Sequence, residues 1–179
     1  MQIYVDFDGV ILDTDTIIDR EFDKEKDIKR SDFVQNYDWK KLVNSATIIN
    51  DSLKFLKKSK HEIFILSKVS SLNEGISKVQ YLREHEIFIN IHLVPTKISK
   101  SDIVNPQGNI LIDDKVYNLD EWSSKGGIAL FFNKDNLDYD IRGIRNTKYL
   151  KINNLEILAN SDIKQYYDSL LKQNSSLND

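Results

Sequence analysis

The stretch MQIYVDFDGVILDTD (residues 1–15) places Asp6 and Asp8 directly behind a short apolar run, and the later stretch NILIDDK places Asp113 and Asp114 in the same way. Each apolar run is typical of a buried strand. Because ligands gather at the carboxyl ends of the strands in an open parallel sheet, we expect these four carboxylates to share one crevice. They would repel one another unless a divalent cation neutralised them, and Mg²⁺ takes such oxygen ligands. The two stretches therefore predict both the sheet and a metal site at its edge.

The rest of the chain alternates between short apolar runs typical of strands and longer runs with the spacing of helices. Further β-rich apolar runs predict strands over residues 62–67, 89–95 and 127–132. Apolar residues at helical spacing predict helices over residues 45–60, 73–85 and 161–172. In the second of these helices we expect Lys78 and Arg83 on the outer face. The alternation indicates an α/β fold: a Rossmann-like three-layer sandwich with a central parallel sheet of about five strands.

One segment interrupts this rhythm. Residues 14–44 are polar and charge-rich, with scattered aromatic residues, and predict a small helical cap inserted after the first strand. Residues 1–13 and 45–150 would then form the α/β core. Residues 151–179 would form a C-terminal helical extension and tail.

The composition excludes several classes of function. The chain of 179 residues has no cysteine, which excludes disulfides, thiolate metal sites and cysteine nucleophiles. Its net charge is −3, and its lysines are dispersed, so we see no nucleic-acid surface. Neither a leader peptide nor an apolar run of about 20 residues is visible, so we expect no membrane association and a cytoplasmic protein. The oligomeric state is left open.

The D-x-D pair itself indicates chemistry. Side chains two residues apart on a strand point to the same side, so Asp6 and Asp8 face one substrate. One carboxylate can attack an electrophile while the other transfers a proton. Gly9 lets the backbone turn sharply out of the sheet.

These residues resemble the motifs of the haloacid dehalogenase (HAD) superfamily, in the order that the superfamily has them. DFDGVILDTD is similar to the first motif, IFILS supplies a strand that ends at Ser67, Lys100 precedes the next strand, and ILIDD supplies Asp113 and Asp114. Two further patterns resemble the 5′(3′)-deoxyribonucleotidase-like branch. Their matching residues are Lys78, Tyr81, Leu82 and His85 in the first, and Asn118, Leu119, Trp122, Gly126 and Gly127 in the second.

The resemblance implies a phosphohydrolase that works through an aspartyl-phosphate. Asp6 would be the nucleophile, and Asp8 would protonate the leaving group and then activate water. Ser67 would hydrogen-bond a phosphoryl oxygen. Lys100, which we favour over its neighbour Lys97, would balance the charge of the phosphate and the nucleophile.

The resemblance also implies Mg²⁺ as the cofactor. Its ligands would be Asp6, the backbone carbonyl of Asp8, and the pair Asp113 and Asp114. One member of that pair would bind the metal directly and the other indirectly, in an order that the sequence leaves open.

The substrate is expected to be a small phosphorylated molecule, with a nucleotide or deoxynucleotide as the first candidate. A different small metabolite or a nucleic-acid end is the alternative, because the short cap leaves room for other leaving groups. A non-enzymatic phospho-acceptor module is a remote alternative. The order of the acidic motifs and the presence of Asp8 disfavour it, since a general base would hydrolyse the phosphate that a signal must retain.

Overall fold

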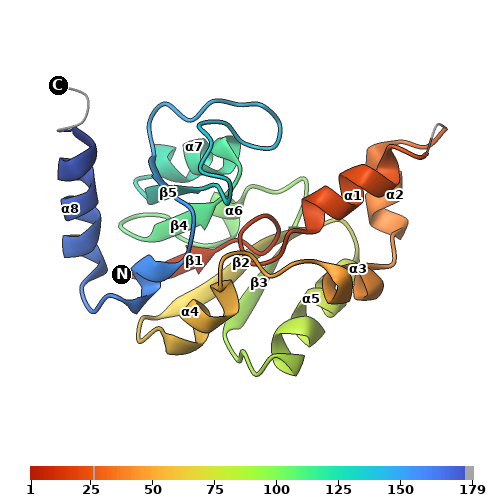
Figure 1. Cartoon of the computed structure of the whole chain (residues 1–179), viewed down its shortest axis with the longest axis horizontal. Helices are drawn as coiled ribbons and strands as arrows, with labels where there is room; N and C mark the ends of the chain where they lie inside the picture. Colours follow the sequence, from red (N-terminus) through yellow and green to blue (C-terminus); the bar gives the residue numbers. More distant parts are fainter. Residues whose placement is uncertain (26, 176–179) are drawn as a thin grey trace.

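The central sheet has six strands, and every pairing between them is parallel (Figure 1). The strands are β1 (Ile3–Val5), β2 (Ile63–Val69), β3 (Asn90–Pro95), β4 (Ile110–Asp113), β5 (Ile128–Phe132) and β6 (Leu150–Ile152). Their order in the sheet is β3-β2-β1-β4-β5-β6. This computed structural model describes residues 1–25 and 27–175.

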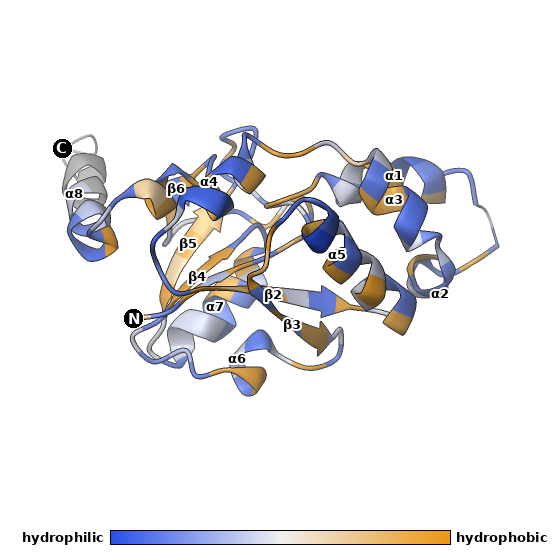
Figure 2. Ribbon diagram, turned by 90° about the horizontal axis from the view of Figure 1, so that it is seen from below, coloured by the Kyte–Doolittle hydropathy of each residue, from blue (hydrophilic) through white to orange (hydrophobic). Residues whose placement is uncertain are grey.

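Helices cover both faces of the sheet and thereby give the three layers that the sequence predicts. They are α1 (Thr14–Phe22), α2 (Arg30–Asn36), α3 (Trp39–Ser45), α4 (Ser52–Lys58), α5 (Leu72–Glu84), α6 (Lys100–Ile103), α7 (Val116–Ser124), the 3₁₀ helix η1 (Glu156–Ala159) and α8 (Ile163–Ser175). Figure 2 shows α4 and α5 on one face and α6 and α7 on the other. The α/β sandwich is confirmed.

Alternation along the strands explains the two faces. In β1, Ile3 and Val5 belong to the apolar cluster that includes α4 and α5, whereas Tyr4 belongs to the cluster that includes α7. Successive strand residues point to opposite faces, so a buried strand needs apolar residues at every position. The central strands meet this condition.

The sheet has one strand more than the expected number of about five. The additional strand, β6, pairs with β5 in the register Leu130↔Leu150, and the expected core boundary at residue 150 falls inside it. Its sequence, Leu-Lys-Ile, is short and contains a charge, which suits an edge strand and gives a weak apolar signal.

The helix expected over residues 45–60 is shorter than predicted. Ser45 is the last residue of α3, and α4 begins only at Ser52. The intervening residues form an antiparallel bridge between Leu12 and Ile48, and Asp51 then takes a left-handed conformation with a φ of 58°. The segment therefore pairs with the chain that leaves β1, which a helix could not do.

Helices α1 and α2, and α3 up to its last residue, Ser45, fall within the segment predicted to be a cap, at the carboxyl end of β1 (Figure 1). Helix α3 packs against α5, and Trp39 is buried there. Phe33 stacks at an angle on Phe22 and Tyr37. These aromatic residues thus serve mainly to pack the segment.

At the other end of the molecule, α8 confirms the helix expected over residues 161–172. The sequence predicts a tail from residue 173 onward, but α8 continues to Ser175; the rest of the predicted tail, residues 176–179, lies outside the described part of the chain. None of the helices in the described part has both the length and the apolar character needed to cross a membrane.

The contact between Gly127 and Trp122 gives a test of the packing. A Cβ added at Gly127 would lie 2.2 Å from the Trp122 ring, which is fully buried. We expect Gly127→Ala to lower the free energy of unfolding by about 2–3 kcal/mol through overpacking, measured by urea denaturation. Gly108→Ala is the control, because its new Cβ has open space and only the positive φ of 69° costs stability, about 1 kcal/mol. Equal losses in the two variants would contradict the packing argument.

Candidate active site

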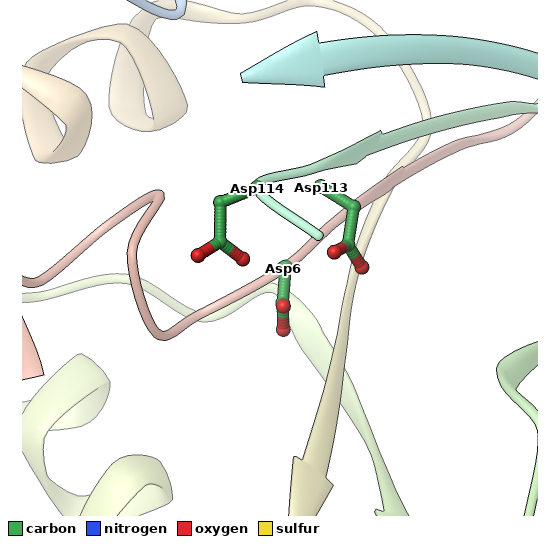
Figure 3. Close-up of side chains that lie close together, drawn as sticks. All are labelled: Asp6, Asp113 and Asp114. Atoms are coloured by element: carbon green, nitrogen blue, oxygen red, sulfur yellow. The ribbon is translucent and has the colours of Figure 1, made fainter. Parts of the chain in front are cut away.

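The register between β1 and β4 brings three carboxylates together at the edge of the sheet. Val5 is paired with Ile112, so Asp6, which follows β1, lies beside Asp113 and Asp114 at the end of β4. Carboxylate oxygens of the three residues lie within 4.8 Å of one another (Figure 3). All three residues are buried. Three of the four carboxylates that the two acidic stretches predict to share one crevice therefore meet there.

Lys100 holds two of these carboxylates. It opens α6, is buried, and places its Nζ 2.9 Å from Asp6 Oδ1 and 2.6 Å from Asp113 Oδ2. Burial alone would lower the pKa of Lys100, but Asp113 and Asp6 outweigh it and raise that pKa to about 12.. Lys97, by contrast, is exposed.

The two members of the acidic pair differ in their surroundings. Asp113 accepts hydrogen bonds from Lys100, from the Asn118 side chain at 3.0 Å and from the Lys115 backbone at 2.9 Å. Among the residues that the structure describes, Asp114 accepts hydrogen bonds only from Lys115 Nζ, which lies 3.3 Å from its Oδ1 and 3.0 Å from its Oδ2. Asp113 is therefore saturated by protein donors, and Asp114 keeps free acceptor capacity.

Gly9 makes room for Asp114. Its φ is +72°, and a Cβ there would lie 2.3 Å from Asp114 Oδ2. The glycine that the sequence assigns to a sharp turn thus also lets the backbone approach the acidic cluster closely.

Burial and mutual repulsion disfavour the charged forms of Asp6 and Asp114. Burial, with the charges of Asp113 and Asp8, raises the pKa of Asp6 to about 6, against the opposing effect of Lys100. Burial raises the pKa of Asp114 well above its usual range, although Lys115 opposes this. A bound cation would relieve both shifts, because it favours the charged form of each carboxylate.

Asn118 adds a second feature that fits a cation. In the part of the chain that the structure describes, its Oδ1 is the one buried side-chain oxygen or nitrogen without a hydrogen-bond partner. Such orphaned atoms are costly and rare. The amide that carries this oxygen donates its Nδ2 to both oxygens of Asp113, so it lies beside the acidic cluster, in which Asp6 and Asp114 are oxygen donors of the kind that Mg²⁺ prefers. The residues present therefore fit the metal.

Asp8 and Ser67, the other predicted site residues, meet at a third lysine. The Asp8 carboxylate accepts a hydrogen bond from Thr14 Oγ1 at 2.7 Å and another from Lys78 Nζ. Ser67 is fully buried in β2, and Lys78 Nζ lies 3.0 Å from its Oγ. Asp8 does not join the cluster of Asp6, Asp113 and Asp114, since its carboxylate points to Lys78.

Lys78 is the residue that sequence reasoning misplaced. It was expected on the outer face of α5, and instead its side chain is completely buried. Its Nζ contacts Glu74 Oε1 at 2.6 Å and lies 4.9 Å from the Trp39 ring centre. Two signals could have located it: the i,i+4 spacing of Glu74 and Lys78, and its place in the branch pattern.

The site opens into a cavity of about 230 Å³. The cavity contains Asp6 and Asp8, and Ile18, Val34 and Trp39 from α1 to α3 form part of its wall. A second cavity of about 270 Å³ lies beyond Asp114 and contains none of the predicted catalytic or phosphate-binding residues. A leaving group attached to a phosphate at Asp6 would therefore occupy the first cavity.

Known structures share this fold. A HAD-like family hydrolase from Xanthomonas campestris matches 97% of this chain and 98% of its own, with a TM-score of 0.61 and 10% identity. YfnB of Bacillus subtilis, assigned as a HAD hydrolase and solved with magnesium, matches 94% of this chain and 97% of its own, with a TM-score of 0.59 and 12% identity. D,D-heptose 1,7-bisphosphate phosphatase of Burkholderia thailandensis matches 88% of this chain and 95% of its own, with a TM-score of 0.51 and 12% identity.

No protein-family model matches the sequence, and neither does any curated protein. At identities this low, the structural matches establish the fold alone. The chain has the α/β fold of HAD hydrolases and phosphatases.

The buried Lys78 gives the test of the site's architecture. Lys78→Met removes the charge that balances Glu74 and Asp8, so we expect a loss of about 3–5 kcal/mol in the free energy of unfolding. In the double variant Glu74→Leu/Lys78→Met the fully buried pair is gone and only Asp8, which is partly exposed, lacks its lysine partner, so most of the loss should be recovered. Urea denaturation of the two variants and the wild type measures this. A double variant less stable than Lys78→Met would show that the unpaired charge of Glu74 is not the cause of the loss in the single variant.

Proposed function

We propose that the chain is a Mg²⁺-dependent phosphomonoester hydrolase that works through an aspartyl-phosphate on Asp6. The observation that carries the proposal is the position of Asp6: a buried carboxylate at the end of β1, bound to Lys100 and facing Asp113 and Asp114. A carboxylate attacks a phosphate dianion only where the negative charge is neutralised, and this cluster supplies the means.

Each residue has a role in the two chemical steps. Asp6 attacks phosphorus, and the ester oxygen leaves with a proton from Asp8. Asp8 then takes a proton from water, whose oxygen attacks the phosphorus and releases inorganic phosphate from Asp6. Ser67 and Lys100 bind the phosphoryl oxygens. Thr14 and Lys78 hold Asp8 through both of its oxygens, so its carboxylate stays in one orientation between the steps.

The free acceptor capacity of Asp114 supports Asp114 over Asp113 as the direct metal ligand. We assign Asp6 and Asp114 as direct metal ligands with the backbone carbonyl of Asp8, and Asp113 as the residue that holds Lys100 and Asn118 in place. When bound, Mg²⁺ would neutralise these carboxylates and polarise the phosphate.

The substrate is proposed to be a small phosphorylated molecule, with a nucleotide or deoxynucleotide as first candidate. The support is the branch pattern on α5 and α7, in which Lys78, Tyr81, Asn118 and Trp122 are buried. Lys78 and Asn118 contact acids of the site, Tyr81 and Trp122 pack in the core, and none of them selects a base. Another small metabolite or a nucleic-acid end therefore remains the second candidate.

Asp114→Asn tests the metal assignment without turnover. For the wild type we expect Mg²⁺ at 100 times its Kd to add about 2.7 kcal/mol of stability. In Asp114→Asn this gain should vanish, while the chelated protein should be at least as stable as the chelated wild type, because burial already disfavours the charged carboxylate. Thermal unfolding with Mg²⁺ or EDTA measures both effects, and Asp102→Asn, a change at an exposed residue, is the control. A full Mg²⁺ gain in Asp114→Asn would overturn the assignment.

Phosphate release tests the activity itself. Wild type, Asp6→Asn and Asp8→Asn would be assayed on nucleoside and deoxynucleoside monophosphates, sugar phosphates and an aryl phosphate, with Mg²⁺ or EDTA. We expect Mg²⁺-dependent release that Asp6→Asn abolishes and that Asp8→Asn lowers by about 10²–10⁴-fold.

Two results would count against the proposal. A fully active Asp6→Asn variant would overturn the mechanism. Phosphate retained on Asp6 for hours, with no release, would favour the phospho-acceptor alternative.

A further inference from the structure

Two basic side chains on the wall of the 230 Å³ cavity have no part in the proposed chemistry. Lys68 follows Ser67 in β2, and Arg142 lies in the connection between β5 and β6. Both contact Tyr117, in the first turn of α7: Lys68 Nζ lies 5.1 Å and Arg142 Cζ 4.7 Å from the centre of its ring. Three separate segments thus place two cations and a phenol side by side.

These two cations differ from the others in the same cavity. Lys115 is paired with Asp15 and Asp114, and Arg30 is paired with Asp19. In contrast, neither Lys68 nor Arg142 forms a salt bridge with any carboxylate of the described residues. Their positive charge is therefore available to a ligand.

The electrostatic surroundings of Lys68 support this availability. Burial lowers its pKa, and the charge of Glu121 opposes that effect only in part. The Glu121 carboxylate already accepts a hydrogen bond from Ser99 at 2.6 Å. A bound anion beside Lys68 would stabilise the charged form of its side chain, which the protein's own carboxylates do only in part.

The phosphate undergoing hydrolysis does not need these cations. Lys100 and a Mg²⁺ ion held by Asp6 and Asp114 would balance its charge, and Ser67 would donate a hydrogen bond to it. Lys68, Arg142 and Tyr117 line the same cavity as Asp6 and Asp8, together with Thr96, so they face the molecule to which that phosphate is attached. An anion bound there would have to belong to the leaving group.

We propose that the substrate is a bisphosphate, whose second phosphate is bound by Lys68 and Arg142 beside Tyr117. This inference rests on the proposed phosphatase activity and narrows its substrate class. Asp6 displaces the ester oxygen, which leaves protonated with the product and its second phosphate, and water then releases inorganic phosphate from Asp6. Arginine and lysine together suit a phosphate, because the guanidinium can donate two parallel hydrogen bonds and the ammonium acts as a compact charge.

The size of the cavity favours a compact carbon skeleton between the two phosphates. Sites for drug-sized ligands usually measure about 300–1,000 Å³. A cavity of about 230 Å³ holds a phosphorylated sugar more readily than a nucleoside. Sugar bisphosphates and nucleoside bisphosphates share the proposed chemistry, and separate assays distinguish them.

The test compares matched pairs of esters. Fructose 1,6-bisphosphate would be compared with fructose 1-phosphate and fructose 6-phosphate, and adenosine 3′,5′-bisphosphate with adenosine 5′-monophosphate. We expect the wild type to favour the bisphosphate of at least one pair by about tenfold or more in kcat/KM, mainly through KM. Lys68→Met and Arg142→Leu should each lower that ratio about tenfold.

Arg145→Leu is the matched control, because Arg145 lies in the same connection and is exposed, without lining the cavity. Its ratio should equal that of the wild type. Equal loss of the ratio in Arg145→Leu would show that general surface charge, and not the proposed subsite, attracts the second phosphate.

A binding measurement separates this inference from the phosphatase proposal. Asp6→Asn with Mg²⁺ would be titrated calorimetrically with the same esters. Monoester hydrolysis without any preference for a bisphosphate would overturn the subsite and leave the phosphatase intact. Tight bisphosphate binding that Lys68→Met weakens, with no turnover by the wild type, would support the subsite and overturn the phosphatase. Neither turnover nor bisphosphate binding would overturn both.

Discussion

The repulsion among buried carboxylates at one edge of the sheet is the constraint on which the site depends. Three lysines offset this repulsion with their positive charge, each from a different element: Lys78 from α5, Lys100 from α6 and Lys115 from the start of α7. Each has at least two carboxylate partners within salt-bridge distance. Buried charges of this kind are tolerated only when they are paired and hydrogen-bonded. The three lysines therefore set the position of the acids, and the helices that carry them cannot shift without uncovering a charge.

Two ion pairs connect the core to the segment of α1, α2 and α3. Lys115 reaches Asp15 on α1 at 2.9 Å, and Lys134, beyond β5, reaches Asp13. Trp39 on α3 covers the ammonium of Lys78. The segment is thus attached at the charged residues of the site itself. Its apolar side chains then supply one wall of the cavity next to Asp6, so attachment and substrate contact come from the same short stretch.

The sequence was sufficient for the parts of the structure whose signals are local. Buried strands with an acid at the end are visible as apolar runs followed by aspartate, which is why the sheet and the meeting of Asp6, Asp113 and Asp114 could be predicted. Lys100 could be preferred over Lys97 only through the resemblance to HAD motifs. The position of Lys78 could not be read from periodicity, because a lysine on an amphipathic helix normally faces water. Its burial depends on Glu74, Asp8 and Trp39, and these come together only in the folded chain.

Other differences between prediction and structure also depend on contacts between distant segments. The spacing of residues 46–51 predicts a helix, but Ile48 pairs with Leu12 in an antiparallel bridge. The β5–β6 connection has no periodic pattern, so nothing in the sequence indicated that Arg142 would reach Tyr117. The roles of Lys68 and Arg142 depend on segments far apart in the chain, which a single sequence without its fold does not join.

The central place of β1 has a consequence for folding. Its neighbours are β2 and β4, so Ile3 must find Ile63 on one side and Ile110 on the other. Contacts of such long sequence separation slow folding, because a large loop must close before they form. During synthesis, the strand that carries Asp6 stays without its second neighbour until β4 has left the ribosome. One edge of this apolar strand therefore stays unpaired until then, and the sheet closes at its middle only when the second acidic stretch arrives.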